Sequence, residues 1–503
     1  MTSPLSPDTV IGVIGAGTMG AGIAQVAAAA GHPVLLYDVS KDAAKSGRAR
    51  LAKGLESLVT KGRMTEVQAD RIIARIGIAE TLHELASCGL VLEAIIEKLE
   101  VKQQLFLKLE EFLLEGTILA SNTSSISITA IGSVLSRPQA LVGMHFFNPA
   151  PVMKLVEVVS GLATNPDVAQ RIHATAAAWG KKPVHARSTP GFIVNRVARP
   201  YYAEALRLVE ECAAPMALID RLLVAGAGFQ MGPFRLMDLI GNDVNASVTK
   251  ATFDAFFGDP RFRPSLLQSE YVAAGRFGRK SGQGFYGYSK DAIEAPVSPP
   301  DPQPLTGPVQ VSGNPTPLQG LLTRLEALSV PLERDLSEGS ARLSYGAAHL
   351  MVTDGRPATL RATDRDSGLV VVDLADDYAT VTDLAFAIQD GADPKIACDA
   401  QALLAAAGIA GHQIDDTPGL VVARTLAMLV NEACEAQLCG IATCDSIDTA
   451  MRFGVNHPRG PFEWMERLGT RTFETILDGM SNSYGDDRYR ASIRLRRWAR
   501  TKG

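Results

Sequence analysis

The stretch TVIGVIGAGTMGAGIAQVAAAAGHPVLLYD occupies residues 9–38 and indicates the fold of the N-terminal part of the chain. It begins with an apolar run of strand length and passes through G-x-G-x-x-G at residues 15–20 into an alanine-rich helical segment. It ends with a second apolar run and Asp38, which comes 18 residues after Gly20. Strand, glycine turn, helix, strand and acid, in this order, form the pattern of a dinucleotide-binding fold.

Each part of this pattern has a physical role in binding NAD. Gly15 permits the tight turn, Gly17 lets the backbone approach the pyrophosphate, and Gly20 allows close helix–strand packing. The helix N-terminus presents amide groups and a positive dipole to the phosphates. Asp38 can accept both ribose hydroxyls and would repel a 2′-phosphate, which favours NAD over NADP. The expected cofactor-binding residues are Gly15, Ala16, Gly17, Thr18, Met19, Gly20 and Asp38. The alternative is a glycine-rich turn in a parallel α/β protein of another kind.

Composition narrows the class of protein. The chain has 503 residues, 46% of them hydrophobic and 20% charged, with a formal net charge of −5. The length calls for roughly two to four domains, and the charge balance argues against a nucleic-acid partner. No signal-peptide pattern and no apolar run long enough to cross a bilayer is visible, and six cysteines in so long a chain do not indicate a disulfide framework. These features predict a cytoplasmic protein without a membrane segment.

Further elements follow the dinucleotide pattern. Residues 40–86 predict a projecting helical hairpin that turns at residues 61–63, where Lys61 could meet an anionic ligand or simply belong to a solvated charge cluster. Apolar runs at residues 89–96, 117–120, 141–147, 155–159 and 183–186 predict later strands of the same sheet. Ser121-Asn122-Thr123-Ser124-Ser125 follows one of them at the edge where open α/β sheets bind ligands. A cap for the helix that begins near Ile126 is the alternative role of this polar run.

An internal repeat organises the second half of the chain. Thr189-Pro190-Gly191 recurs as Thr417-Pro418-Gly419, and Gly232-Pro233-Phe234 recurs as Gly460-Pro461-Phe462, both at an offset of 228. Asn195 corresponds to Ala423, so the first copy is expected to be the working one. We expect no counterpart of the stretch around His145 before the second copy, one active site per chain, and a packing role for the second copy in place of a dimer contact.

The predicted fold is α/β. A Rossmann-like doubly wound sheet with a helical hairpin insertion is followed by an all-α domain, a small α/β segment and a second copy of the all-α unit. The expected boundaries are 1–187 for the NAD-binding domain, 188–290 for the first helical domain, 291–320 for a proline-rich linker, 321–412 for the α/β segment and 413–503 for the second helical repeat.

His145 and Glu157 stand in two apolar runs that would not ordinarily contain them. A carboxylate in a buried strand is costly unless it is paired, and an imidazole is a suitable partner. Oxidation of a carbinol by NAD requires a base for the hydroxyl proton, a task that suits His145, while Glu157 would fix its tautomer. Ser124 and Asn195 could hydrogen-bond the substrate oxygen. A satisfied core histidine and a structural salt bridge are the alternatives, and no metal site is expected.

Four motifs together resemble the L-3-hydroxyacyl-CoA dehydrogenase family: the glycine loop with residues 21–25, residues 121–125, His145-Phe146-Phe147-Asn148-Pro149, and residues 189–196. The resemblance implies oxidation of (S)-3-hydroxyacyl-CoA thioesters by NAD, and a homodimer is expected. It implies catalytic roles for His145 and Glu157 and substrate contacts for Ser124 and Asn195. Lys61 would lie by the CoA, and the residues implied near the cofactor are Glu97, Lys102, Asn148 and Lys280.

The long form of the chain is similar to the 3-hydroxyadipyl-CoA dehydrogenases of aerobic phenylacetate degradation. An adipyl chain ends in a carboxylate, so a basic residue should meet it, and Arg199, Arg235 and Arg279 are candidates. 3-Hydroxybutyryl-CoA, or short-chain 3-hydroxyacyl-CoA in general, is the alternative substrate. A crystallin-like structural NAD-binding protein and a dehydrogenase of free hydroxy acids are the alternatives from other classes.

Overall fold

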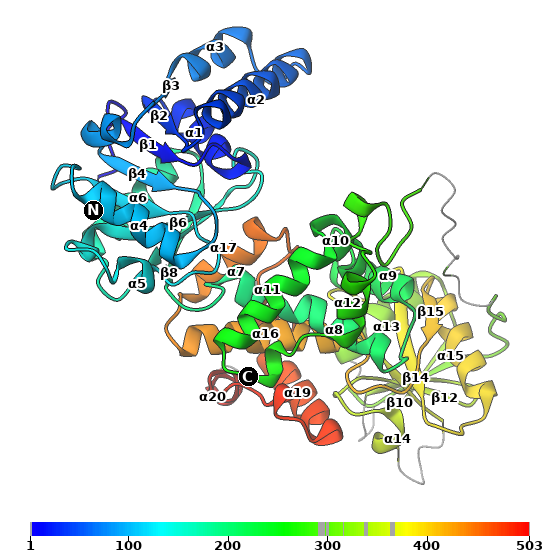
Figure 1. Ribbon diagram of the computed structural model, residues 1–503. Coiled ribbons are helices and arrows are strands. Elements are labelled where there is room, and N and C mark those ends of the chain that lie inside the picture. Colours follow the sequence, from blue (N-terminus) through cyan, green and yellow to red (C-terminus); the bar gives the residue numbers. More distant parts are fainter. Residues whose placement is uncertain are drawn as a thin grey trace. The chain divides into compact units, whose positions relative to one another are not determined.

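The computed structural model of the protein describes residues 3–289, 297, 301–314, 316–335, 341–362 and 368–501. The chain divides into two compact units, each built on its own sheet (Figure 1). The first unit consists of Met1–Arg196 with Cys439–Val455, and the second of Val197–Leu438 with Asn456–Gly503.

The first unit contains an eight-stranded sheet with the order β3-β2-β1-β4-β5-β6-β7-β8. The strands run parallel except that β7 and β8, parallel to each other, are antiparallel to the rest. All four residues of β1 are buried, as expected for a central strand covered on both faces. The Rossmann-like doubly wound sheet is confirmed. Its strands are β1 (Ile11–Ile14), β2 (Val34–Tyr37), β3 (Ile76–Ile78), β4 (Leu90–Glu93), β5 (Ile118–Ser121), β6 (Leu141–Phe146), β7 (Leu155–Ser160) and β8 (Lys182–Arg187).

Helices cover both faces of this sheet. Apolar residues of α1 (Thr18–Ala29), α2 (Lys41–Thr60), α3 (Glu66–Ala74) and α6 (Pro166–Ala178) share one core with alternate strand residues such as Val156 and Val158. Leu155, which points the other way, meets Gly454 of α17 (Cys444–Gly454). The remaining helices of the unit are α4 (Leu99–Glu110), α5 (Ile128–Gly132) and the short α7 (Val194–Val197).

Helices α2 and α3 form the hairpin expected within residues 40–86. The Ser40 side chain accepts a hydrogen bond from the Ala43 amide at the start of α2, and Thr65 and Gln68 form a capping box at the start of α3. The same range also contains β3 and a 3₁₀ helix at Leu82–Ser87, which the helical pattern did not predict. Ile-Gly-Ile is too short a run for its strand character to be visible in the sequence.

The second unit contains a seven-stranded mixed sheet with the order β10-β9-β11-β12-β13-β14-β15. Strand β9 and the start of α13 fall within residues 291–320, so the proline-rich range is a linker only in part; Pro299 and Pro300 lie outside the described residues. Val309 and Val311 are fully buried in the sheet, but so short an alternation does not stand out among prolines. The elements are β9 (Val309–Ser312), β10 (Leu332–Asp335), β11 (Arg342–Tyr345), β12 (Ala348–Val352), β13 (Leu369–Val372), β14 (Asp383–Ile388), β15 (Ala410–Gln413), α13 (Gln319–Ala327), α14 (Ala358–Arg361) and α15 (Pro394–Ala406).

The 228-residue repeat includes this sheet as well as the helices. Helices α6 and α15 have equivalent bounds, each with a capping residue before a first-turn proline, and β13, β14 and β15 pair as β6, β7 and β8 do. His145 corresponds to Asp373 and Glu157 to Ala385, and these two lie opposite each other in the paired strands as His145 and Glu157 do. The expectation that the second copy has no counterpart of the His145 stretch was therefore wrong. The repeat was missed there because the two strand sequences share little beyond apolar character.

The two helical copies are paired by equivalent contacts. The first copy contains α8 (Arg199–Glu210), α9 (Met216–Ala227), α10 (Pro233–Ile240), α11 (Asn242–Ala255) and α12 (Leu266–Ala273). The second contains α16 (Val422–Leu438), α17, α18 (Pro461–Leu468), α19 (Thr470–Tyr484) and α20 (Ile493–Thr501). Helix α8 packs on its equivalent α16. Glu204 pairs with Arg488 at 2.9 Å, while its equivalent Glu432 pairs with Arg261 at 3.0 Å. The copies are thus related by an internal pseudo-two-fold axis, as expected for a packing role.

One helix of each copy packs against the sheet of the other half. Helix α17 of the second copy covers β7 and β8 in the first unit, and its equivalent α9 covers β14 in the second unit. A Cβ at Gly454 would lie 3.0 Å from Val194, and a Cβ at its equivalent Gly226 would lie 2.9 Å from Val422, the equivalent of Val194. Residues 439–455, which lie within the expected second helical repeat of residues 413–503, therefore belong to the first unit.

His457 provides a test of this internal pairing. Its ring contacts Phe229, its own repeat equivalent, with centroids 4.9 Å apart, and its buried Nδ1 has no hydrogen-bond partner among the described residues. Burial lowers the pKa of His457 from 6.5 to about 3. Since the folded-state pKa is depressed, the unfolded chain takes up the proton first, and stability is lost as the pH falls below 6.5.

We therefore expect His457→Phe to make unfolding less sensitive to acid. Relative to the variant, the wild-type protein should lose about 2 kcal/mol of unfolding free energy between pH 7 and pH 5. Thermal denaturation of both proteins at pH 7, 6 and 5 measures the effect. A difference between their midpoints that stays constant over this range would contradict it.

Candidate active site

The glycine loop has the geometry that a dinucleotide pyrophosphate requires. Gly15 has a φ of 99°, and a Cβ at Gly20 would collide with the carbonyl oxygen of Gly15. A Cβ at Gly17 would meet nothing within 4 Å, so open space lies in front of the first turn of α1. No side chain caps that helix, and its first amides remain available to a phosphate. The loop therefore fits the expected cofactor.

Asp38 lies beside this loop at the end of β2. Its Oδ2 accepts a hydrogen bond from the Ala16 amide at 2.8 Å, and its Oδ1 accepts one from the Ser40 amide at 3.1 Å. The guanidinium of Arg50 donates to the Ala16 carbonyl at 2.9 Å. Asp38 and Arg50 thus hold the loop from two sides. No pattern in the sequence indicated this role for Arg50, which lies inside a polar helix.

Lys102 is enclosed by carboxylates rather than open to a dinucleotide. Its side chain is 1% exposed, and its ammonium lies 2.9 Å from both oxygens of buried Glu93 and 3.3 Å from Glu97. Ser121 also donates to Glu93. Lys102 therefore holds Glu97, and its expected place near the cofactor stays a prediction. Glu93 ends an apolar strand just as Glu157 interrupts one, and the same reasoning could have identified it.

Glu97 binds the polar run at residues 121–125. Its Oε1 accepts hydrogen bonds from the Thr123 hydroxyl at 2.6 Å and from the Ser124 and Ser125 amides at 3.0 and 3.2 Å. Burial acts to raise the pKa of Glu97, but these hydrogen bonds and the ammonium of Lys102 bring that pKa below 4.5. An ionised Glu97 therefore fixes the backbone that carries Ser124.

His145 and Glu157 form the pair expected from the sequence. They lie directly opposite each other in β6 and β7, and Nδ1 of His145 is 2.6 Å from Oε2 of Glu157. Both side chains are buried. Oε1 of Glu157 accepts hydrogen bonds from the amides of Ile193 and Val194, each at 3.0 Å. The carboxylate therefore joins the histidine to the start of α7.

The neighbours of this pair orient both the ring and the loop. Phe147 and Phe192 contact the imidazole, with centroids 4.5 and 5.9 Å away, and Phe192 has a φ of 46°. The side-chain oxygen of Asn122 accepts a hydrogen bond from the Phe146 amide at 2.8 Å. This bond connects the polar run at residues 121–125 to the strand that carries His145. No described group hydrogen-bonds Nε2 of His145. Asn122 was expected only as part of the polar run, without a partner.

The other expected residues have different surroundings. Asn195 follows Val194 in α7 and is partly exposed. Its side-chain amide has no hydrogen bond to another described residue. Asn148 and Lys61 are exposed, at the end of β6 and at the turn of the helical hairpin. Lys280 belongs to the second unit, where it pairs with Asp243 at 2.6 Å. The first unit thus carries the quartet of Ser124, His145, Glu157 and Asn195.

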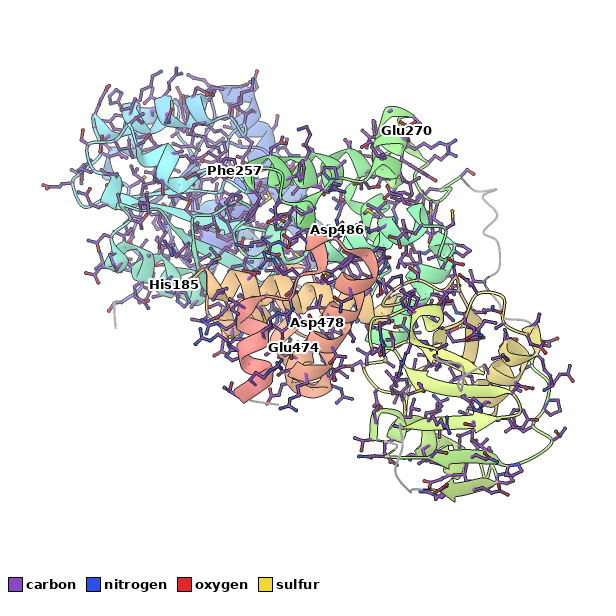
Figure 2. The ribbon with its side chains drawn as sticks, turned by 90° about the horizontal axis from the view of Figure 1, so that it is seen from below. His185, Phe257, Glu270, Glu474, Asp478 and Asp486 are labelled. Atoms are coloured by element: carbon purple, nitrogen blue, oxygen red, sulfur yellow. The ribbon has the colours of Figure 1, made fainter. Side chains whose placement is uncertain are left out.

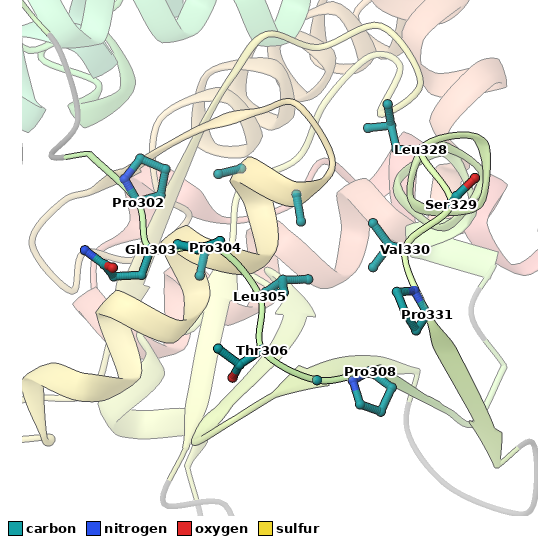
Figure 3. Close-up of a pocket in the computed structure, with 14 residues that line it drawn as sticks. Pro302, Gln303, Pro304, Leu305, Thr306, Pro308, Leu328, Ser329, Val330 and Pro331 are labelled. Carbon is teal, nitrogen blue, oxygen red and sulfur yellow. The ribbon is translucent and has the colours of Figure 1, made fainter.

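A cavity of about 660 Å³ lies in the second unit (Figure 3). It is lined by residues 302–308 and 328–331 together with three alanines of α15, and no titratable side chain is among them. It is therefore not a candidate for catalysis.

Models of known families match almost the whole chain. The NAD binding domain of 3-hydroxyacyl-CoA dehydrogenase matches residues 10–189, and the C-terminal domain of the same family matches residues 191–288 and again 419–502. A reduced Rossmann-fold domain of 3-hydroxybutyryl-CoA dehydrogenase matches residues 350–418. The chain belongs to the 3-hydroxyacyl-CoA dehydrogenase family. It is an NAD-dependent 3-hydroxyacyl-CoA dehydrogenase, as the sequence predicted.

Two relatives and one crystal structure are similar to this dehydrogenase over different shares of its length. The 3-hydroxyadipyl-CoA dehydrogenase of Escherichia coli K12 is 43% identical over 97% of each chain. A probable 3-hydroxybutyryl-CoA dehydrogenase of Bacillus subtilis is 45% identical over 96% of its own length but only 55% of this chain. The crystal structure of 3-hydroxybutyryl-CoA dehydrogenase from E. coli K12 aligns with a TM-score of 0.89 at 41% identity and covers 99% of both chains. Within the residues that the structure describes, no helix of this dehydrogenase is long and apolar enough to span a bilayer.

The buried network around Lys102 can be tested by substitution. Lys102→Met would leave Glu93 buried without a counter-charge, and we expect it to lower the unfolding free energy by about 3–5 kcal/mol. Lys41→Met, which removes an exposed ion pair with Glu80, is the matched control and should leave the midpoint almost unchanged. Thermal denaturation of the two variants makes the comparison, and equal midpoints would show that the buried network does not hold this edge of the sheet.

Proposed function

We propose that this dehydrogenase oxidises (S)-3-hydroxyadipyl-CoA to 3-oxoadipyl-CoA, with His145 as general base and Glu157 as its partner. The observation that carries the proposed chemistry is the 2.6 Å contact between Nδ1 of His145 and Oε2 of Glu157. The adipyl chain is favoured by the full-length likeness to the E. coli 3-hydroxyadipyl-CoA dehydrogenase. The name of the equally similar E. coli crystal structure favours the alternative, 3-hydroxybutyryl-CoA.

The contact with Glu157 determines which nitrogen of His145 can act as the base. A carboxylate accepts hydrogen bonds, so the ring proton lies on Nδ1 and the lone pair on Nε2. Nε2 takes the proton of the substrate hydroxyl, and the carboxylate stabilises the imidazolium that forms. The amides of Ile193 and Val194 hold the carboxylate in place while this happens.

Ser124 and Asn195 orient the substrate in this proposal. Ser124 is fixed by Glu97, and Asn195 follows the two amides that bind Glu157. Each can donate a hydrogen bond to the substrate oxygen or to the thioester carbonyl, which aligns the reacting carbon. A structural protein would have no need for this quartet, which argues against a crystallin-like role.

The glycine loop and Asp38 hold NAD, which accepts the hydride when bound. Glu97, Lys102, Asn148 and Lys280 are proposed to lie near the cofactor, and Lys61 is proposed to contact the CoA. A dehydrogenase of free hydroxy acids would bind no CoA, so retention on immobilised CoA would distinguish that alternative.

A cytoplasmic location and a homodimer complete the proposal. The internal pairing of the two helical copies already covers α8 with α16, so a homodimer would use another surface. Sedimentation equilibrium would give the assembly state.

Two variants test the acid–base pair. His145→Gln removes the base and should lower kcat for 3-hydroxyacyl-CoA about 10²- to 10⁴-fold. Glu157→Gln leaves only one oxygen, which cannot serve both the imidazole and the amides of Ile193 and Val194, and a similar loss is expected because the tautomer is no longer fixed. NADH absorbance measures activity, and fluorescence titration with NADH checks that the cofactor still binds. Wild-type turnover by His145→Gln would refute the assignment.

A substrate panel tests the acyl chain. We expect kcat/KM for 3-hydroxyadipyl-CoA to exceed that for 3-hydroxybutyryl-CoA by at least tenfold, because a charged group held by a matching site discriminates more strongly than a methylene does. The opposite order would establish the short-chain alternative.

A further inference from the structure

The strand that carries His145 extends beyond one of its neighbours. In the part of the sheet that the structure describes, β5 pairs with β6 only as far as Ser121, which lies opposite Gly143. Strand β6 continues beyond this point to Phe146. On its other side, β7 pairs with β6 up to that last residue. His145 therefore lies in a section of β6 that has a strand neighbour on one side only.

The side chain of Asn122 supplies the hydrogen-bond acceptor that a longer β5 would supply with its backbone. Asn122 is the first residue after β5, and its Oδ1 accepts the hydrogen bond of the Phe146 amide at 2.8 Å. Phe146 is buried, and a buried amide without an acceptor is costly. The end of β6 is thus held by Asn122 on one side and by β7 on the other, where Glu157 contacts His145.

Asn122 is itself held to the sheet. Its backbone amide donates to the Glu93 carbonyl at 2.9 Å. Its side-chain nitrogen has no hydrogen bond to another described residue, so the side-chain oxygen is the atom that acts here. Two residues further on, the Ser124 amide donates to Glu97 at 3.0 Å. Asn122 therefore connects the end of β6 to the segment that carries Ser124, and the position of His145 relative to Ser124 depends on this connection.

In the second half of the chain the equivalent strands are built without this side-chain amide. When β5 and β12 are matched through their pairing with β6 and β13, Asn122 is equivalent to Val352. The amide of Leu374, the equivalent of Phe146, donates instead to Asp373 at 2.8 Å. Packing of these strands therefore does not require an asparagine. Asn122 is replaced in the second half, as are the residues proposed for catalysis.

We propose that Asn122 is a positioning residue for His145. Its side-chain oxygen holds the last backbone amide of β6 and so fixes the imidazole relative to Ser124. This inference rests on the proposed function, because the base that Asn122 positions is the one assigned there. Without the contact, the end of β6 is held by β7 alone, and Nε2 of His145 moves relative to the substrate hydroxyl. The glycine loop, built on β1 and α1, is not affected.

Two variants remove the acceptor oxygen. Asn122→Leu keeps a similar side-chain volume, and Asn122→Val introduces the residue of the second half. Each should lower kcat about 10- to 100-fold, because a displacement of roughly 1 Å costs rate on this scale, while KM for the thioester and the dissociation constant of NADH stay within about threefold. NADH absorbance is followed with whichever of 3-hydroxyadipyl-CoA and 3-hydroxybutyryl-CoA reacts faster, so the result does not depend on the acyl chain.

A double variant separates positioning of the base from any other role of Asn122. In His145→Gln no base remains to be positioned, so adding Asn122→Leu should lower kcat by less than about threefold more. A further tenfold loss would overturn the inference. Wild-type turnover by His145→Gln alone would contradict the proposed function and the inference together.

Asn122→Asp restores the acceptor oxygen. Above the pH at which His145 takes up a proton, kcat should return to within about threefold of the wild type. The added carboxylate favours the imidazolium, so the acidic limb of the kcat profile should move to higher pH. His185→Gln removes an exposed histidine of β8 (Figure 2) and should leave this limb in place. Failure of Asn122→Asp to restore kcat would count against the inference.

Asn165→Leu is the matched control for lost stability. Asn165 also accepts a backbone amide through its side-chain oxygen, from Asp167 at 2.8 Å, but its own amide donates to Gln139, which precedes the start of β6. This variant should lower the thermal midpoint about as much as Asn122→Leu does and leave kcat within about threefold of the wild type. An equal loss of kcat in the two variants would overturn the inference. Wild-type kcat in both Asn122 variants, with His145→Gln impaired, would overturn the inference and leave the proposed function intact.

Discussion

The carboxylate of Glu157 is the contact on which the rest of the site depends. One oxygen holds the imidazole of His145, and the other holds two amides at the start of α7. Hydrogen bonds to a charged group contribute about 1.5–3 kcal/mol each, and here they offset the cost of burying the Glu157 carboxylate in a strand. The same group therefore orients the base, attaches the segment that carries Asn195, and holds that segment to the central sheet.

The second half of the chain contains an equivalent arrangement that lacks the residues proposed for catalysis. Asp373 occupies the position of His145, and Ala385 that of Glu157. In place of the pair of His145 and Glu157, Asp373 alone accepts hydrogen bonds from the amides of Val421, Val422 and Ala423, at 2.7–3.0 Å. Leu420 has a φ of 49°, close to that of its equivalent Phe192. Attachment of a helix to a sheet by a carboxylate is thus common to both halves, and the histidine is added only in the first.

The sequence was sufficient for the parts of the molecule that depend on local pattern. The glycine loop, the pair of His145 and Glu157, and the repeated helices all follow from residue types at fixed spacing, and the structure contains each of them. It was insufficient where partners are distant in sequence or where a pattern is short. The enclosure of Lys102 by Glu93 and Glu97, the strand Val309–Ser312 and the contact of Asn122 with Phe146 are of this kind. Apart from Glu93, which ends an apolar strand, no local pattern in the chain distinguishes these residues from ordinary surface or loop residues.

The same distinction explains why the two units of the fold are not continuous in sequence. The repeat correctly indicated two equivalent segments, but equivalence in sequence does not require each segment to pack on its own sheet. Helix α17 lies on β7 and β8, and α9 lies on β14, so each half completes the sheet of the other. The close contacts of Gly454 with Val194 and of Gly226 with Val422 place this exchange next to the two carboxylate-held helix starts. In the first half that start carries Asn195, and the packing of the second copy thereby supports the residue that is proposed to orient the substrate. The second copy lacks equivalents of the residues proposed for catalysis. It keeps the contact of Gly454 with Val194, which packs against the start of α7.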